Sequence, residues 1–228
     1  MKLNNRRTLL IGLAFFSICA FWQMYDTIIP LILRDTFHLG DSLSGVIMAA
    51  DNILALVLLP LFGKLSDRTR TPLGKRMPYI VCGTACAVAL TLALAGVDAP
   101  GRFTAFLILL GLLLIAMGTY RSPAVALMPD VTPKPLRSKA NAIINLMGAL
   151  GGIYALGAVK LLIKSTHADG RANYTPVFVA VAGLMAVSVA LLVWRVKENA
   201  LAAQNADPEE EEQGPGGKLP PDQARTWR

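Results

Sequence analysis

The sequence predicts an all-α membrane protein, a bundle of six transmembrane helices, and three observations lead to that fold class. Hydrophobic residues make up 54% of the 228 residues and charged residues only 16%, and the mean hydropathy is +0.50, which is unusual for a soluble domain. Six apolar stretches are long enough to cross the hydrocarbon layer, which takes about 20 residues per helix. Basic residues gather in alternate connections between these stretches, as in a membrane protein of fixed orientation.

The first stretch begins like a signal peptide, because basic residues precede an apolar run. The run continues as far as Leu33, however, so we expect an uncleaved first helix. The first and fourth stretches each carry an aromatic–charge pair near a proline, which favours two triplets of helices related as a 3+3 inverted repeat. These pairs are Tyr25-Asp26 with Pro30 and Tyr120-Arg121 with Pro123. The predicted spans are 8–33, 44–63, 77–97, 103–128, 140–163 and 176–196.

The net charge of +7 is explained by topology rather than by nucleic acid. Its basic residues concentrate at 2–7, 64–76, 134–139 and 195–197, while the other connections are nearly free of them. Loops rich in lysine and arginine stay in the cytoplasm. We therefore expect a multi-pass protein of the cell's inner (plasma) membrane with both termini cytoplasmic.

The composition changes after the last span. Residues 1–197 are predicted to form the six-span domain, and 198–228 are acidic and rich in proline and glycine. Such a segment has too little apolar surface to fold alone. It is predicted to be a disordered cytoplasmic tail or linker.

Two carboxylates lie inside the predicted spans, where an ionised side chain costs roughly 2.5–3.5 kcal/mol. At about 1.5 Å per residue, Asp26 and Asp51 lie roughly 12 Å and 10 Å below the outer surface on consecutive helices. At matching depth they could share a proton or a monovalent cation. The alternative is that Asp26 only accepts hydrogen bonds from Tyr25 or Gln23, and that Asp51 stays hydrated.

Arg121 is the most informative charged residue within a span. It lies roughly 13 Å from the cytoplasmic face, too far for its stem to reach the surface. Asn145 is predicted at the same depth on the next helix, with Asn141 one turn away on the same face. A guanidinium with two amides suits sugar hydroxyls or a carboxylate. A structural arginine paired within the bundle is the alternative.

The aromatic cluster beside Asp26 suits a sugar. Aromatic rings stack on the apolar side of sugar rings, and amides bond to hydroxyls. Trp22, Gln23 and Tyr25 supply these groups. The alternative, equally favoured, is that these three side chains only pack between helices, with their polar ends as the sole polar groups.

A basic loop at 63–78 joins the second and third predicted spans. Its residues Gly63-Lys-Leu-Ser-Asp67-Arg68 and Gly74-Lys-Arg76-Met-Pro78 resemble the corresponding motif of major facilitator superfamily transporters. The longer spacing within the motif resembles the branch of glycoside–pentoside–hexuronide cation symporters and sucrose–proton symporters (solute carrier family 45). Further segments resemble other signatures of that branch: Asp51-Asn52, Tyr120-Arg121-Ser-Pro123 and Arg137-Ser-Lys-Ala-Asn141.

The resemblance implies the N-terminal half of a transporter for proton-coupled sugar symport by alternating access, with Arg121 at a coupling position. Sodium-binding acids of the melibiose-type carriers are replaced here by Ala55 and Leu59, which favours protons. The implied coupling and substrate residues are Asp26, Asp51, Arg121, Asn145, Gln23, Trp22, Tyr25 and Asn141. The implied gating residues, which would tie the loop to its neighbours and to a helix of the other half, are Gly63, Asp67, Arg68, Gly74, Arg76 and Asp130.

The second six-span half would come from a longer chain, a partner chain or a homodimer. No metal site, cofactor or enzymatic activity is expected, because no metal-ligand spacing or catalytic constellation stands out in the sequence. The alternative function is a transport-inactive truncated half that acts as a membrane interaction or regulatory module. A membrane enzyme is the least favoured class.

Overall fold

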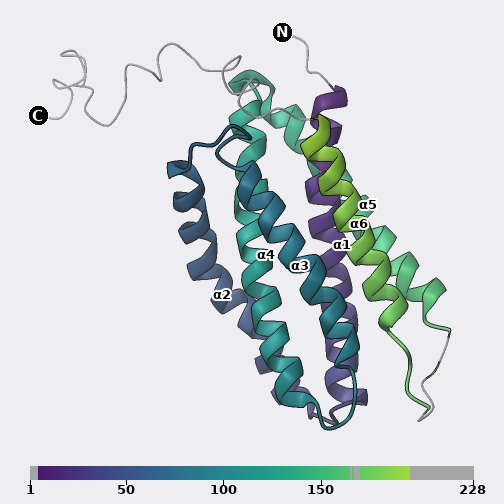
Figure 1. The fold of residues 1–228 in the computed structure, drawn as a ribbon. Helices are drawn as coiled ribbons and strands as arrows, with labels where there is room; N and C mark the ends of the chain where they lie inside the picture. The colour runs from purple at the N-terminus through teal and green to yellow at the C-terminus, as the bar shows by residue number, and fades with distance from the viewer. Residues whose placement is uncertain (1–4, 165, 167–169, 196–228) are drawn as a thin grey trace, which may run out of the picture.

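The computed structural model describes residues 5–164, 166 and 170–195, and the predicted tail at 198–228 lies outside them. Six long α-helices follow one another along the chain (Figure 1). They are α1 (Asn5–Asp35), α2 (Asp41–Arg68), α3 (Met77–Gly96), α4 (Phe103–Val131), α5 (Arg137–Leu162) and α6 (Thr175–Arg195), with a short 3-10 turn, η1 (Lys134–Leu136), before α5. The predicted all-α fold is confirmed.

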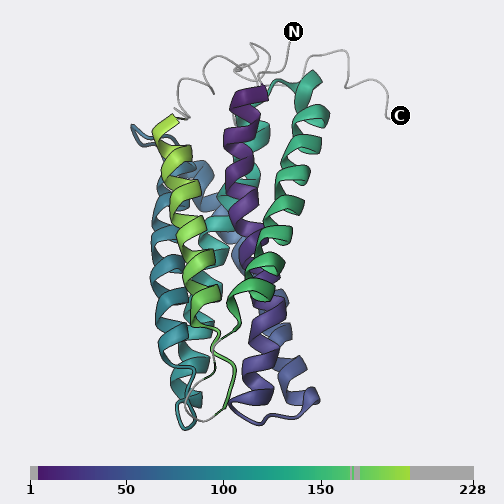
Figure 2. The same cartoon turned by 90° about the vertical axis from the view of Figure 1, so that its right-hand side faces the viewer.

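All six helices are long and apolar enough to cross a membrane. They alternate in direction, so the α2–α3 and α4–α5 connections lie at the same end of the bundle, with the start of α1 and the end of α6 (Figures 1 and 2). The α1–α2 and α3–α4 connections lie at the opposite end. The protein is therefore a multi-pass membrane protein.

The central helix of the bundle is α1. It packs along α5, touches α6, α2 and α4 as well, and lies between α5 and α6 in Figure 2. The third helix packs between α4 and α6, whereas α2 rests mainly on α4 at the edge of the bundle (Figure 1). Large side chains such as Phe21, Phe106 and Phe178 are fully buried between the helices. One face of α1 is left free by this arrangement.

Two glycines let the helices approach closely. A Cβ atom on Gly151 of α5 would collide with the backbone carbonyl of Phe16 on α1. A Cβ atom on Gly83 of α3 would lie 2.8 Å from the backbone nitrogen of Tyr120 on α4. Small residues at helix contacts are the usual means of close packing in a membrane. Both contacts involve the helices that carry the candidate site.

The predicted loop at 63–78 is partly helical, which corrects its expected start. The second helix continues to Arg68, so Gly63 and Asp67 lie in its last turns. After Pro60 no proline occurs in this stretch until Pro72, which disfavours a helical conformation of the residue before it. The connection that remains contains Gly74 at φ 123°, a conformation that favours glycine.

The packing of Gly151 gives a stability prediction. Because an added methyl group would meet backbone rather than a flexible side chain, Gly151→Ala should lower the free energy of unfolding by about 1–3 kcal/mol. Gly157→Ala is the matched control, because nothing lies within 4 Å of its Cβ position. It should be neutral or stabilising by up to about 1 kcal/mol. Thermal unfolding in detergent, followed by circular dichroism, measures both, and equal melting temperatures for the two variants would contradict the close α1–α5 contact.

Candidate functional site

The free face of α1 carries polar side chains. Residues on this face are exposed or half-buried, while those between them are buried against the other helices. Spacings of four residues place them on one side of the helix. They are Trp22, Gln23, Asp26, Thr27, Pro30, Leu31 and Arg34. Cys19, one turn before Gln23, is half-buried next to this strip.

A cavity of about 430 Å³ opens between this face and α5. The first helix contributes Trp22, Gln23 and Asp26, and α5 contributes Gly148 and Gly152. A side chain at 152 would narrow the cavity, because a Cβ atom there would lie 3.6 Å from the Gln23 Oε1 atom. The volume falls in the range of small-molecule sites, about 300–1,000 Å³. An aromatic ring, an amide and a carboxylate thus share one small-molecule-sized space.

Arg121 reaches this region from α4. Its guanidinium carbon lies 5.4 Å from the centre of the Trp22 ring, within the range of a cation–π interaction. Among the described residues, no carboxylate lies within ion-pairing distance of that guanidinium. The alternative role of Arg121, a structural arginine paired within the bundle, therefore has no carboxylate partner among the described residues, and the charge lies beside the aromatic ring.

Asp26 and Asp51 lie on adjacent helices, close enough for their carboxylates to interact electrostatically. Asp51 Oδ1 also accepts hydrogen bonds from the backbone nitrogen and the amide of Asn52, at 2.7 Å and 2.9 Å. Asp26 itself is exposed on the free face of α1. Asp26 thus lines the cavity, and Asp51 lies on the neighbouring helix α2 outside the residues that line it.

Three of the predicted site residues lie elsewhere. Tyr25 is buried in the core, and its hydroxyl has no hydrogen-bond partner within the described residues. Asn141 and Asn145 are exposed on α5, and neither lines the cavity. The sequence predicts how deep each of these residues lies along its helix. The direction in which each side chain points depends on how α1 and α5 pack, which the sequence does not reveal.

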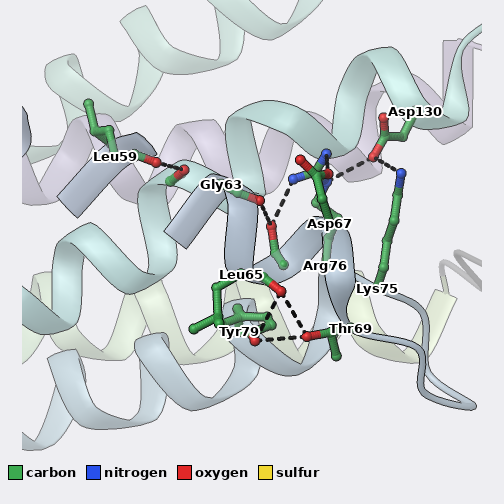
Figure 3. Close-up of polar contacts among 11 residues, drawn as sticks. Leu59, Gly63, Leu65, Asp67, Thr69, Lys75, Arg76, Tyr79 and Asp130 are labelled. Atoms are coloured by element: carbon green, nitrogen blue, oxygen red, sulfur yellow. Dashed lines mark hydrogen bonds and ion pairs between the residues drawn. The ribbon is translucent and has the colours of Figure 1, made fainter. Parts of the chain in front are cut away.

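A polar network joins α2, α3 and α4 at one end of the bundle (Figure 3). Arg76 is its centre: Nη2 pairs with Asp67 at 2.6 Å and Nε with Asp130 at 2.8 Å. Nη1 donates to Ser66 Oγ at 2.8 Å, and Lys75 pairs with Asp130 at 3.1 Å. Because Arg76 is only 5% exposed, these bonds form in a low-dielectric setting and hold the three helix ends together.

The predicted gating residues divide into two groups in the structure. Asp67, Arg76 and Asp130 form the network, and sequence reasoning missed their partners Ser66 and Lys75. Arg68 is exposed and forms no ion pair with the described residues. Gly63 has room for a Cβ atom, 3.4 Å from Ser122 Oγ, so contacts inside this part of the chain do not require glycine there.

A second network, which the sequence did not reveal, lies at the opposite end. Thr36 donates to Asp98 at 2.6 Å, and Arg171 Nη1 lies 2.8 Å from the Thr36 hydroxyl and 3.5 Å from Asp98. Tyr174 donates to Asp35 at 3.4 Å, and burial and that carboxylate raise the pKa of Tyr174 above its ordinary value. The network joins the ends of α1 and α3 to the start of α6.

The Arg76 network gives the second prediction. Arg76→Gln leaves Asp67 without its partner, and we expect the free energy of unfolding to fall by about 2 kcal/mol, less than for a fully buried pair because Asp67 is half exposed. Arg68→Gln removes a charge from the same segment without removing a contact and should change stability by less than about 0.5 kcal/mol. Chemical denaturation in micelles measures the free energy of unfolding of both variants. An equal decrease for the two would contradict the role of Arg76 as the centre of the network.

Comparison with known proteins identifies a family and a similar curated protein. Residues 11–227 match the family model of the Major Facilitator Superfamily. The chain is also similar to a lactose permease of Lactobacillus helveticus, with 28% identity over 172 residues, which covers 68% of this chain and 27% of that protein. The chain therefore spans about a quarter of the length of this curated relative.

Proposed function

The chain belongs to the Major Facilitator Superfamily, and from that premise we propose that it forms one half of a secondary active transporter for proton-coupled symport of a sugar or glycoside. The superfamily predicted from the 63–78 motif is confirmed. The narrower branch of glycoside and sucrose symporters is part of the proposal. The name of the similar lactose permease supports a sugar as the solute.

The observation that carries the proposal is the position of Arg121 over Trp22, beside the cavity that contains Asp26. A sugar ring in this cavity would stack on Trp22 and bond to the Gln23 amide. The guanidinium, which has no carboxylate partner among the described residues, attracts an ionised Asp26 or a hydroxyl of the solute. A charged side chain within a membrane span is costly and is by default a candidate for a functional site.

Proton coupling is proposed to depend on Asp26 and Asp51. Two carboxylates on neighbouring helices repel each other when both are ionised, and binding of one proton removes that repulsion. A solute that bonds to Asp26 in one protonation state then binds together with the proton. Asn145 and Asn141, although outside the cavity in this structure, stay candidates for contact with the solute in another conformation.

The remaining wall of the site is proposed to come from a second six-helix half, in a longer chain, a partner chain or a second copy. Large apolar side chains such as Leu56 on α2 and Ile153 on α5 are exposed, Ile153 lines the cavity, and both are available for such a contact. The Arg76 network would keep α2 and α4 together while the halves rock. The moving interface would be faced by Gly63, Arg68, Gly74 and the exposed part of Asp67. The protein would lie in the plasma membrane with the basic end of the bundle on the cytoplasmic side.

The first test of this proposal is Arg121→Ala. Lactose uptake driven by an inward proton gradient is measured in proteoliposomes, with the chain alone and with the protein as purified from its native membrane. Uptake should fall to the level of empty liposomes, because the charge beside the cavity is lost. Arg102→Ala is the control, because Arg102 is exposed in the α3–α4 connection, and it should transport normally. Unchanged uptake by Arg121→Ala would remove this residue from the mechanism.

The second test separates coupling from binding. Asp26→Asn should abolish accumulation of lactose against its gradient but keep exchange of external for internal lactose, because the amide bonds to hydroxyls but does not release a proton. Accumulation at the normal level would contradict a coupling role for Asp26. If neither the isolated chain nor the native preparation moves lactose, the alternative function as a membrane interaction module is favoured.

A further inference from the structure

We infer that Tyr120 is a positioning residue that holds the Arg121 guanidinium over Trp22 and beside the solute cavity. The relevance of this role to solute binding rests on the proposed function. Tyr120 contacts neither the cavity nor a solute, and its side chain is fully buried between α4 and α1. It therefore acts only through the orientation of α4.

The Tyr120 hydroxyl makes a compact hydrogen-bonded group with α1. Its oxygen lies 2.6 Å from Ser17 Oγ and 3.0 Å from the carbonyl oxygen of Ala14. Ser17 Oγ is itself 2.9 Å from the same carbonyl. The two hydroxyl hydrogens are shared among three close oxygen pairs. Either Tyr120 or Ser17 donates to the Ala14 carbonyl, and the other hydroxyl then donates to the first. No water inside the membrane replaces these bonds when they are lost.

The opposite side of Tyr120 is held by α3. A Cβ atom on Gly83 would lie only 2.8 Å from the Tyr120 backbone nitrogen, so α3 and α4 are in close backbone contact here. The fourth helix is thus fixed at this residue by backbone packing on one side and by a hydrogen bond to α1 on the other. Together these contacts set the rotation of α4 about its own axis.

That rotation decides where Arg121 points. Neighbouring residues on an α-helix differ in direction by about 100°, so fixing Tyr120 toward the core fixes Arg121 toward Trp22. The two helices joined by the Tyr120 hydroxyl are the same two that carry the guanidinium and the ring. Because no carboxylate of the described residues pairs with Arg121, the helix rotation is the main constraint on this charge.

The test uses the emission of Trp22, with Trp194→Phe and Trp227→Phe in every variant so that Trp22 is the single tryptophan. Arg121→Gln supplies the reference shift in emission. Tyr120→Phe, which keeps the ring and loses the hydroxyl, should produce at least half of that shift, and adding Arg121→Gln to it should bring the shift to the reference value and not beyond it. Ser17→Ala is the matched control. It removes a hydroxyl from the same group but leaves the bond from Tyr120 to Ala14, so its shift should be under a fifth of the reference.

A purely structural role would lower the melting temperature of Tyr120→Phe and leave the Trp22 emission unchanged, and that result would overturn the inference. An emission that does not respond to Arg121→Gln would overturn it as well. If Tyr120→Phe does not fold, p-aminophenylalanine is introduced at position 120 to restore a donor. A folded variant of this kind should have the wild-type emission, and the emission of Arg121→Gln would contradict the role. None of these readouts requires transport, so the positioning role and the proposed function can fail separately.

Discussion

The absence of water from the hydrocarbon layer is the constraint on which the rest of this structure depends. A polar group there must find a partner inside the protein or line a cavity, since an unpaired one costs several kcal/mol. Tyr120 and Ser17 satisfy each other between two helices, and Arg76 is surrounded by its acidic partners. Several buried hydroxyls, such as that of Tyr25, have no partner among the described residues. Asp26 and Arg121 are charged groups without an ion pair in this part of the chain, and both lie at the free face of α1, where the candidate site is placed.

The two polar networks explain how the bundle can act as one unit. At one end Arg76 joins α2, α3 and α4, and at the other Asp98 and Arg171 join α3 to the end of α1 and the start of α6. The third helix takes part in both, and close glycine contacts join α1 to α5 and α3 to α4 between them. A domain connected in this way suits rigid-body motion against a second half, which is how alternating access works in this family of folds.

Much of the fold was predictable from the sequence, because the length and apolarity of a membrane span are local properties. The grouping of Trp22, Gln23 and Asp26 was predictable for the same reason, since spacings of three or four residues define a helix face. The orientation of Asn145 and the burial of Tyr25 were not, because they depend on the rotation of one helix against another. The pairing of Thr36 with Asp98 joins residues 62 positions apart and left no local signal. Likewise, Arg68 and Arg76 are both basic residues of one motif, and only the position of the end of α4 selects Arg76.

The central claim is that the free face of α1 and the facing side of α5 form the wall against which the solute binds. Alkylation of Ala149→Cys, in a chain whose native cysteines are replaced by serine, tests it most directly. Ala149 is exposed and lines the cavity, whereas Ala142 is exposed on the same helix outside it. Saturating lactose should slow the reaction of a small maleimide at position 149 at least fivefold and leave Ala142→Cys unaffected. Equal rates at position 149 with and without lactose would contradict the account.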